Sequence, residues 1–311
     1  SGVPVKVKNF EWKTIFNWSK NNSMVESLPE GIDKIQIGSG VYNVKSYAEV
    51  GKPYGAIYAK TFKRDAEGYI LCQLDGSPKE GQDYEYLGCV QADWRGGWNN
   101  VFRLGNFSFS VMFDFQKGGK FFSQTSIQSS VDGQSVKSLE GRDADFFSRK
   151  ILGESDEERY GFMRPQNANT PTANGQIYPD WGRPKGVVLP NCRYDEDVEG
   201  LAGQQVLGYC TPERYWMHYT SRDISRFIYD ASYVKLREIT VSYDLPKKWL
   251  RKTPFQTFRV AAVGRNIATL FANTPHGLDP QATSTTGNAQ GFERGFNLPS
   301  ATYGFDIKVS F

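Results

Sequence analysis

Residue types that carry out catalysis are sparse in this sequence. The chain has two histidines, His218 and His276, and neither stands in a known catalytic motif. It contains no GxSxG nucleophile elbow, no Walker phosphate loop and no HExxH zinc motif. A lone histidine is more often a surface or loop residue than a catalytic one. The sequence therefore predicts no enzyme, no catalytic residue, no metal site and no cofactor.

An acidic run is the feature closest to a cation site. Asp195, Glu196, Asp197 and Glu199 carry carboxylate oxygens of the kind that calcium prefers. Their spacing matches no known calcium loop. A solvated acidic patch is therefore the favoured interpretation, and calcium binding stays open as the alternative.

The four cysteines fall into two pairs that are close in sequence. Both pairs lie in segments that we expect to be extracellular, where disulfides persist. Local Cys72–Cys89 and Cys192–Cys210 disulfides are therefore expected. Four cysteines allow three pairings, and four unpaired thiols are the remaining alternative. No clustered Cys or His spacing indicates zinc.

Aromatic residues are abundant, with 21 Phe, 17 Tyr and 7 Trp. Flat rings stack on sugars and on peptide side chains, so those in the longest loop are candidates to face a substrate or a partner lid. These candidates are Trp181, Tyr209, Tyr215, Trp216 and Tyr219. The alternative, that they pack the loop on itself, is favoured because aromatics in long ordered loops usually serve packing.

Composition narrows the class of protein. The net charge of the 311 residues is +3 and no long basic run is present, which argues against nucleic-acid binding. No segment approaches the roughly 20 apolar residues of a membrane helix, so a helical membrane protein is excluded. A transmembrane β-barrel is compatible with the composition, because its strands alternate apolar and polar residues.

Alternating residues predict six strands, near residues 9–20, 92–104, 107–116, 232–245, 256–267 and 301–311. The last strand alternates without exception from Ala301 to Phe311. A bulge near Arg237 is expected in the fourth strand, because its apolar residues change parity there.

The clearest element is a hairpin around Gly105-Asn106. Both residues tolerate a positive φ, which a tight primed turn requires. That turn places Leu104 opposite Phe107 and Phe102 opposite Phe109, all on one face. Pattern and turn therefore agree on the register.

The connections alternate between long and short, as they do in outer-membrane barrels with short periplasmic turns and long extracellular loops. Residues 21–91, 117–231 and 268–300 are the expected extracellular loops. Six strands cannot close a channel and would leave unpaired edges. The predicted fold is therefore all-β: the C-terminal strands of a larger antiparallel transmembrane barrel with about 22 strands.

One side of these strands is expected to contact lipid and the other a wet lumen. The lipid-facing residues are Phe107, Phe109, Phe113, Phe115, Tyr303, Phe305, Ile307 and Val309. Asp114, Gln116, Asp306 and Lys308 suit the lumen. The final Phe311 suits recognition by outer-membrane assembly machinery. A soluble β-sandwich that buries the same phenylalanines is the alternative.

Motifs along the chain resemble those of SusC/RagA-type TonB-dependent transporters, in the same order. The matching segments are residues 10–21, 94–119, 233–246 (YVKLREITVSYDLP), 258–266, 277–280 (GLDP) and 298–311. Each match is loose, and together they are specific. Residues 21–90 and 121–228 align poorly, so they leave the substrate open.

The resemblance implies TonB-driven import of oligosaccharides or peptides across the outer membrane of a Gram-negative, Bacteroidetes-type bacterium. It implies a SusD-like surface lipoprotein as lid, TonB as a partner through an N-terminal region, outer-membrane lipid around the barrel, and a dimer of transporter–lid pairs. The signal peptide, plug and other N-terminal parts are missing from the sequence, which we interpret as truncation. The alternatives are a non-transporting barrel (an adhesin or secretion component) and a soluble glycan-binding β-domain.

Overall fold

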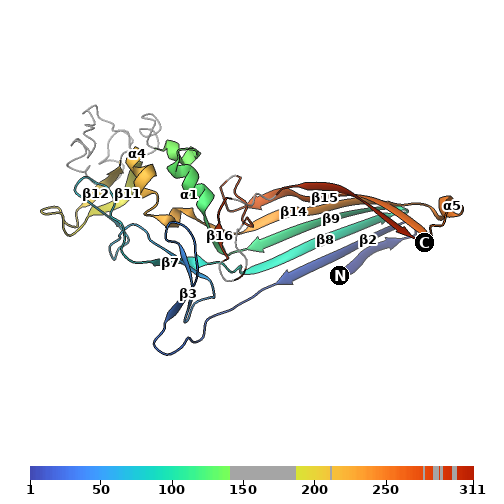
Figure 1. Cartoon of the computed structure of the whole chain (residues 1–311), viewed down its shortest axis with the longest axis horizontal. Coiled ribbons are helices and arrows are strands. Elements are labelled where there is room, and N and C mark those ends of the chain that lie inside the picture. The colour runs from blue at the N-terminus through green and yellow to red at the C-terminus, as the bar shows by residue number, and fades with distance from the viewer. Residues whose placement is uncertain (141–186, 211, 276, 283–286, 288–289, 296–299) are drawn as a thin grey trace.

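A seven-stranded antiparallel sheet dominates the computed structural model, which describes residues 1–140, 187–210, 212–275, 277–282, 287, 290–295 and 300–311. Smaller sheets and short helices gather at one end of this sheet (Figure 1). In spatial order the strands are β1 (Gly2–Val7), β2 (Phe10–Ser19), β8 (Trp94–Leu104), β9 (Phe107–Lys117), β14 (Tyr233–Asp244), β15 (Thr257–Ala272) and β17 (Thr302–Ser310).

The β8–β9 hairpin has the predicted register. Leu104 pairs with Phe107 and Phe102 with Phe109, and Gly105 turns the chain at a φ of +57°. A positive φ is easily adopted by glycine because it has no Cβ. The expected bulge is also present, since the β14 pairings shift between Leu236 and Glu238.

Two features of the sheet differ from the expectation. β1 is absent from the predicted strands, the first of which begins near residue 9, and it contains Pro4. In this chain β1 pairs only with β2, at an edge of the sheet, which is where proline is tolerated. β15 also continues to Ala272, five residues beyond the predicted end at residue 267.

Three excursions leave the same end of the sheet, between β2 and β8, between β9 and β14, and between β15 and β17 (Figure 1). They form three small sheets: β3 (Lys34–Ser39), β4 (Lys45–Glu49), β5 (Ala56–Ala59) and β7 (Glu85–Cys89); β12 (Gln205–Cys210), β11 (Val187–Tyr194) and β6 (Ile70–Cys72); and β13 (Ile228–Asp230), β10 (Lys120–Ser123) and β16 (Phe292–Glu293). Their helices are α1 (Gln124–Val131), η1 (Val136–Leu139), α4 (Pro212–Arg214), η3 (Tyr215–Tyr219) and η4 (Ile224–Phe227).

The excursions have cores of their own, and these cores are shared. One cluster combines Ile57 of the first excursion, Phe122 and Phe227 of the second and Phe292 of the third, each at most 2% exposed. A second cluster lies around the β12–β11–β6 sheet. Buried apolar area is the main stabilising term of a folded unit, so the excursions are folded bodies rather than irregular loops.

The large sheet is a single layer that extends away from the excursions (Figure 1). The short helix α5 (Lys247–Leu250) and the C-terminus lie at its far end. Its apolar side chains are open: Phe305 is 91% exposed and Phe107 58%. Among the described residues, no helix is both long enough and apolar enough to cross a membrane.

Candidate functional site

The two faces of the large sheet differ in chemistry. One face carries the phenylalanines, and the face opposite them carries charged side chains in ion pairs. Arg259 donates to Asp244 at 2.6 and 2.9 Å, and Arg265 donates to Glu238 at 2.9 Å. Charged groups are costly in hydrocarbon and stable beside water. The charged face is therefore suited to line an aqueous interior.

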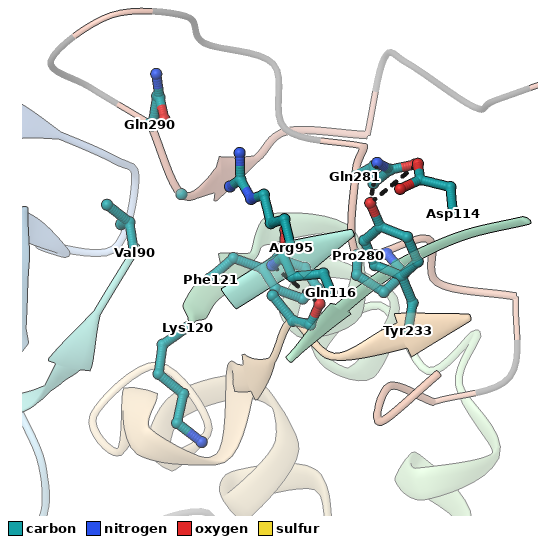
Figure 2. A pocket seen from close by; sticks show the side chains of 12 residues that line it. Val90, Arg95, Asp114, Gln116, Lys120, Phe121, Tyr233, Pro280, Gln281 and Gln290 are labelled. Carbon is teal, nitrogen blue, oxygen red and sulfur yellow. Dashed lines mark hydrogen bonds between the residues drawn. The ribbon is translucent and has the colours of Figure 1, made fainter. Parts of the chain in front are cut away.

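A cavity of about 460 Å³ opens where the charged face meets the excursions. Figure 2 shows its lining side chains, which come from three neighbouring strands and from all three excursions. Arg95 lies near the start of β8, Gln116 near the end of β9 and Tyr233 at the start of β14. Because these strands are antiparallel, the three positions meet at the same edge of the sheet: Arg95 pairs with Gln116, and Gln116 with Tyr233.

A hydrogen-bond network shapes one wall of the cavity. The Tyr233 hydroxyl donates to Asp114 Oδ2 at 3.3 Å and accepts from Gln281 Nε2 at 2.5 Å. The Arg237 guanidinium binds Asp114 and also donates to Gln281 Oε1 at 2.6 Å. Dashed lines in Figure 2 trace the contacts among Asp114, Tyr233 and Gln281. Strand and loop are thereby held in one arrangement.

Lys235 anchors the third excursion to β14. Its side chain is 7% exposed, and its ammonium donates to Asp279 Oδ2 at 2.6 Å and to Gln281 Oε1 at 2.9 Å. Asp279 also accepts from the Gln281 backbone N–H at 2.8 Å. A buried ammonium needs such partners, because an unpaired charge in the interior is strongly destabilising. The cavity wall is therefore rigid where it contacts the loop.

The opposite side of the cavity presents polar groups available to a ligand. Arg95 is exposed, and no carboxylate in the described part of the chain forms an ion pair with it. Gln290 also reaches the cavity, and the Lys120 ammonium lies 3.7 Å from Asp230 Oδ2. Guanidinium and amide groups bind carboxylates, carbonyls and hydroxyls. The site can therefore hold a polar molecule.

The structure places three of the aromatic candidates of the long loop in a core. Tyr215 and Trp216 are 1% exposed and Tyr219 is 2% exposed, in the core of the second excursion. Trp216 Nε1 donates to the Glu140 carbonyl at 3.1 Å. These three side chains therefore pack the excursion, which is the interpretation favoured from the sequence, and they do not face a ligand. Trp181 lies outside the described residues. Tyr209 lies in β12, and its side chain is also outside the description.

The predicted lipid-facing residues share one face of the large sheet. Phe107 pairs with Tyr243 and Phe109 with Val241 across β9 and β14, and Phe305 and Ile307 lie opposite Ala262 and Val260 across β15 and β17. The remaining members, Phe113, Phe115, Tyr303 and Val309, have the same parity. Phe311 packs on Phe255 with ring centroids 5.3 Å apart.

Two polar residues on this apolar face accept hydrogen bonds from tryptophans. Trp12 Nε1 donates to Asn100 Oδ1 at 3.0 Å, and Trp98 Nε1 donates to Thr14 Oγ1 at 2.9 Å. Asn100 is only 4% exposed. Each pair joins β2 to β8, so the polar atoms are satisfied within the sheet.

The cysteines are not arranged in the expected pairs. Cys72 lies in β6, whereas Cys89 lies in β7 of a different sheet and donates to the Tyr54 carbonyl at 3.3 Å. The Cys72–Cys89 pairing is therefore wrong for this fold. Cys192 and Cys210 lie on adjacent strands, but their partners across the sheet are Val206 and Val187. The thiol in contact with Cys72 is that of Cys192.

The acidic run is held by lysines. Asp195, whose side chain is 4% exposed, accepts from Lys63 at 2.8 and 3.0 Å and from Lys79 at 2.8 Å. Burial would raise the pKa of Asp195, but the two lysines outweigh it and lower the pKa to about 2. In the described parts of the chain, no group of three or more His, Cys, Asp or Glu side chains could hold a metal. Asp195 and Asp197 are therefore part of one ion-pair cluster with Lys63 and Lys79.

Sequence reasoning did not single out Arg95, Tyr233 or Gln281 as site residues. The signal that was present is their parity, since Arg95 and Tyr233 alternate with the apolar residues of β8 and β14. Gln281 directly follows the GLDP motif. These segments meet only because β8, β9 and β14 are neighbours in the sheet. The alternation of residues within one strand does not predict that strand order.

Comparison with known proteins gives a consistent result. No family model matches the chain. The "TonB-dependent receptor P3" of Formosa agariphila is 23% identical over 95% of the chain. Solved structures of the RagAB peptide importer in "open-open" and "closed-closed" states match the whole chain with TM-scores of 0.52 and 0.53, at 14% and 15% identity. The chain spans 26% of the curated relative and 28% of the matched structures.

The large sheet, with one apolar and one charged face and with folded excursions at one end, is similar in fold to part of the RagAB importer. The matched proteins are receptors and transporters rather than enzymes. Together the matches make this chain similar to part of a TonB-dependent receptor and to part of the RagAB transporter.

Proposed function

We propose that this chain forms part of the barrel wall and the extracellular surface of a TonB-dependent importer of oligosaccharides or peptides. The importer lies in the outer membrane of a Gram-negative bacterium, with a SusD-like lipoprotein as lid and TonB as the source of energy. The excursions face outward, and α5 lies on the periplasmic side.

The observation that carries the proposal is the contrast between the two faces of the large sheet. The outer face exposes phenylalanines, including Phe107 and Phe305, without a covering layer in this chain. The inner face carries Asp244–Arg259 and Glu238–Arg265 ion pairs. A water-soluble sandwich would bury the first face, whereas hydrocarbon covers it in a barrel. The contrast therefore favours the importer over a soluble binding domain.

The cavity at the end of the inner face is the proposed contact for the imported molecule. Arg95 and Gln290 supply donors, and the Tyr233–Gln281–Asp114 network fixes the wall behind them. The RagAB complex, whose fold this chain shares, is a peptide importer. That likeness supports peptides as one of the two substrate classes.

The test is uptake by the full-length protein in its host. Growth on a peptide mixture and on an oligosaccharide mixture is compared between the wild type, a strain lacking this gene and a strain lacking TonB. Loss of growth on one mixture in both deletion strains supports import and identifies the substrate class. Unchanged growth of the gene deletion on both mixtures, with normal TonB-dependent uptake, contradicts the proposal.

Charge reversal at the cavity tests the site. Arg95→Glu removes a charged donor, and one hydrogen bond from a charged group contributes about 1.5–3 kcal/mol, or roughly 10- to 100-fold in affinity. Arg103→Glu is the matched control, because Arg103 has the same parity on β8 but lies near the opposite end of the strand, 3.7 Å from Asp244. Equal uptake by both variants would exclude Arg95 from binding.

A further inference from the structure

Two buried cysteines from different excursions meet in the β12–β11–β6 sheet. Cys72 ends β6 in the first excursion, and Cys192 lies in β11 of the second. Both are 0% exposed. The strands run parallel, with Cys192 opposite Ile70 and Tyr194 opposite Cys72, so the two cysteines are diagonal neighbours on one face. Their thiols are hydrogen-bonded to each other.

The surrounding contacts hold the two segments in this register. The Asp195 backbone N–H donates to the Cys72 carbonyl at 3.0 Å. The Asp195 carboxylate accepts hydrogen bonds from Lys63 and Lys79, which flank β6 in sequence. Cys89 lies in another sheet, and Cys210 lies opposite Val187, five residues before Cys192. The packing therefore selects one pair out of four cysteines.

We propose that Cys72 and Cys192 form a disulfide that ties the first excursion to the second. The inference rests on the proposed function in one respect, since the outer-membrane setting places both segments in an oxidising compartment. The two thiols lose two protons and two electrons, and the disulfide of a periplasmic thiol oxidase is reduced to a dithiol. Closure brings the two sulfur atoms to about 2.05 Å.

The bond must form before the excursions finish packing. The contact with the Cys192 sulfur and burial both raise the pKa of the Cys72 thiol in the folded protein. The thiolate is the reactive species, so a buried thiol with a raised pKa reacts slowly. Once formed, the same burial protects the disulfide from reductants.

The test uses the full-length protein purified from the outer-membrane fraction, without reductant. The protein is denatured, its thiols are blocked with N-ethylmaleimide, and it is digested with trypsin. Lys79 separates the Cys72 and Cys89 peptides, and Arg193 separates the Cys192 and Cys210 peptides. All four cysteines therefore report independently in the mass spectrum.

The expected result is a linked Cys72–Cys192 peptide that disappears on reduction, with Cys89 and Cys210 labelled before reduction. Cys192→Ala should expose Cys72 to labelling, and Cys89→Ala, the matched control, should leave the link intact. Labelling of all four cysteines, or a link of Cys72 or Cys192 to another cysteine, overturns the inference. Fractionation tests the setting separately, because absence from the outer membrane would instead refute the proposed function.

Discussion

A charge placed on the apolar face of β17 is the sharpest test of the proposed orientation. Phe305 lies near the middle of the strand, opposite Ala262, and is 91% exposed in this chain. If lipid covers it, Phe305→Arg loses about 1.5–3 kcal/mol of apolar burial. An arginine near the bilayer midplane costs about 2–4 kcal/mol more. The expected destabilisation is therefore about 4–7 kcal/mol.

The assay is urea unfolding of the full-length barrel in liposomes, followed by tryptophan fluorescence, with folded barrel in the outer membrane measured in parallel. Asp306→Arg is the control, because it places the same side chain one residue further on, on the charged face. The control should unfold within about 1 kcal/mol of wild type. Equal stability of the two variants would refute the assignment of the phenylalanine face to lipid.

Three further predictions concern single contacts. Asp195 has a folded pKa of about 2, below the ordinary 3.8. Its contribution to the free energy of unfolding, about 2 kcal/mol, is therefore complete above pH 4 and is lost as the pH falls toward 2. Asp195→Asn should abolish this acid dependence, measured by limited proteolysis of the excursions. Glu293 is 3% exposed and accepts hydrogen bonds from Ser123 Oγ at 2.6 Å and from the Thr125 backbone N–H at 3.1 Å. Glu293→Ala should therefore lower the local stability of α1 by about 1.5–3 kcal/mol and speed its amide hydrogen exchange. Unchanged exchange would contradict this role. Asn100→Leu removes the acceptor of Trp12 and should lower barrel stability by about 1–3 kcal/mol in the same urea assay; an unchanged midpoint would show that the pair is dispensable.

Sequence reasoning succeeded where the information is local. The hairpin register follows from Gly105-Asn106 and the alternation around it, because a two-residue turn leaves one pairing. The bulge beside Arg237 follows from a change of parity within one strand. Each feature depends on residues within one or two strands, so a single sequence is enough.

Sequence reasoning failed where the contacts are distant. Separation along the chain pairs Cys72 with Cys89, but the parallel pairing of β6 with β11 brings Cys72 to Cys192. Packing is the favoured role of the aromatic residues around Trp216 by sequence, but the sequence does not show that the other side of their core comes from the first excursion. No local pattern encodes which excursion packs on which.

The parallel pairing of β10 with β16, like that of β6 with β11, links excursions that are separated by transmembrane-length strands. The body formed by the excursions is therefore built from three passes of the chain, and both of its core clusters draw residues from more than one pass. Replacing one excursion with that of a relative would leave the β12–β11–β6 sheet, the β13–β10–β16 sheet or both without one of their contributing segments. Exchange of specificity between such transporters should therefore require the three segments to be transplanted together.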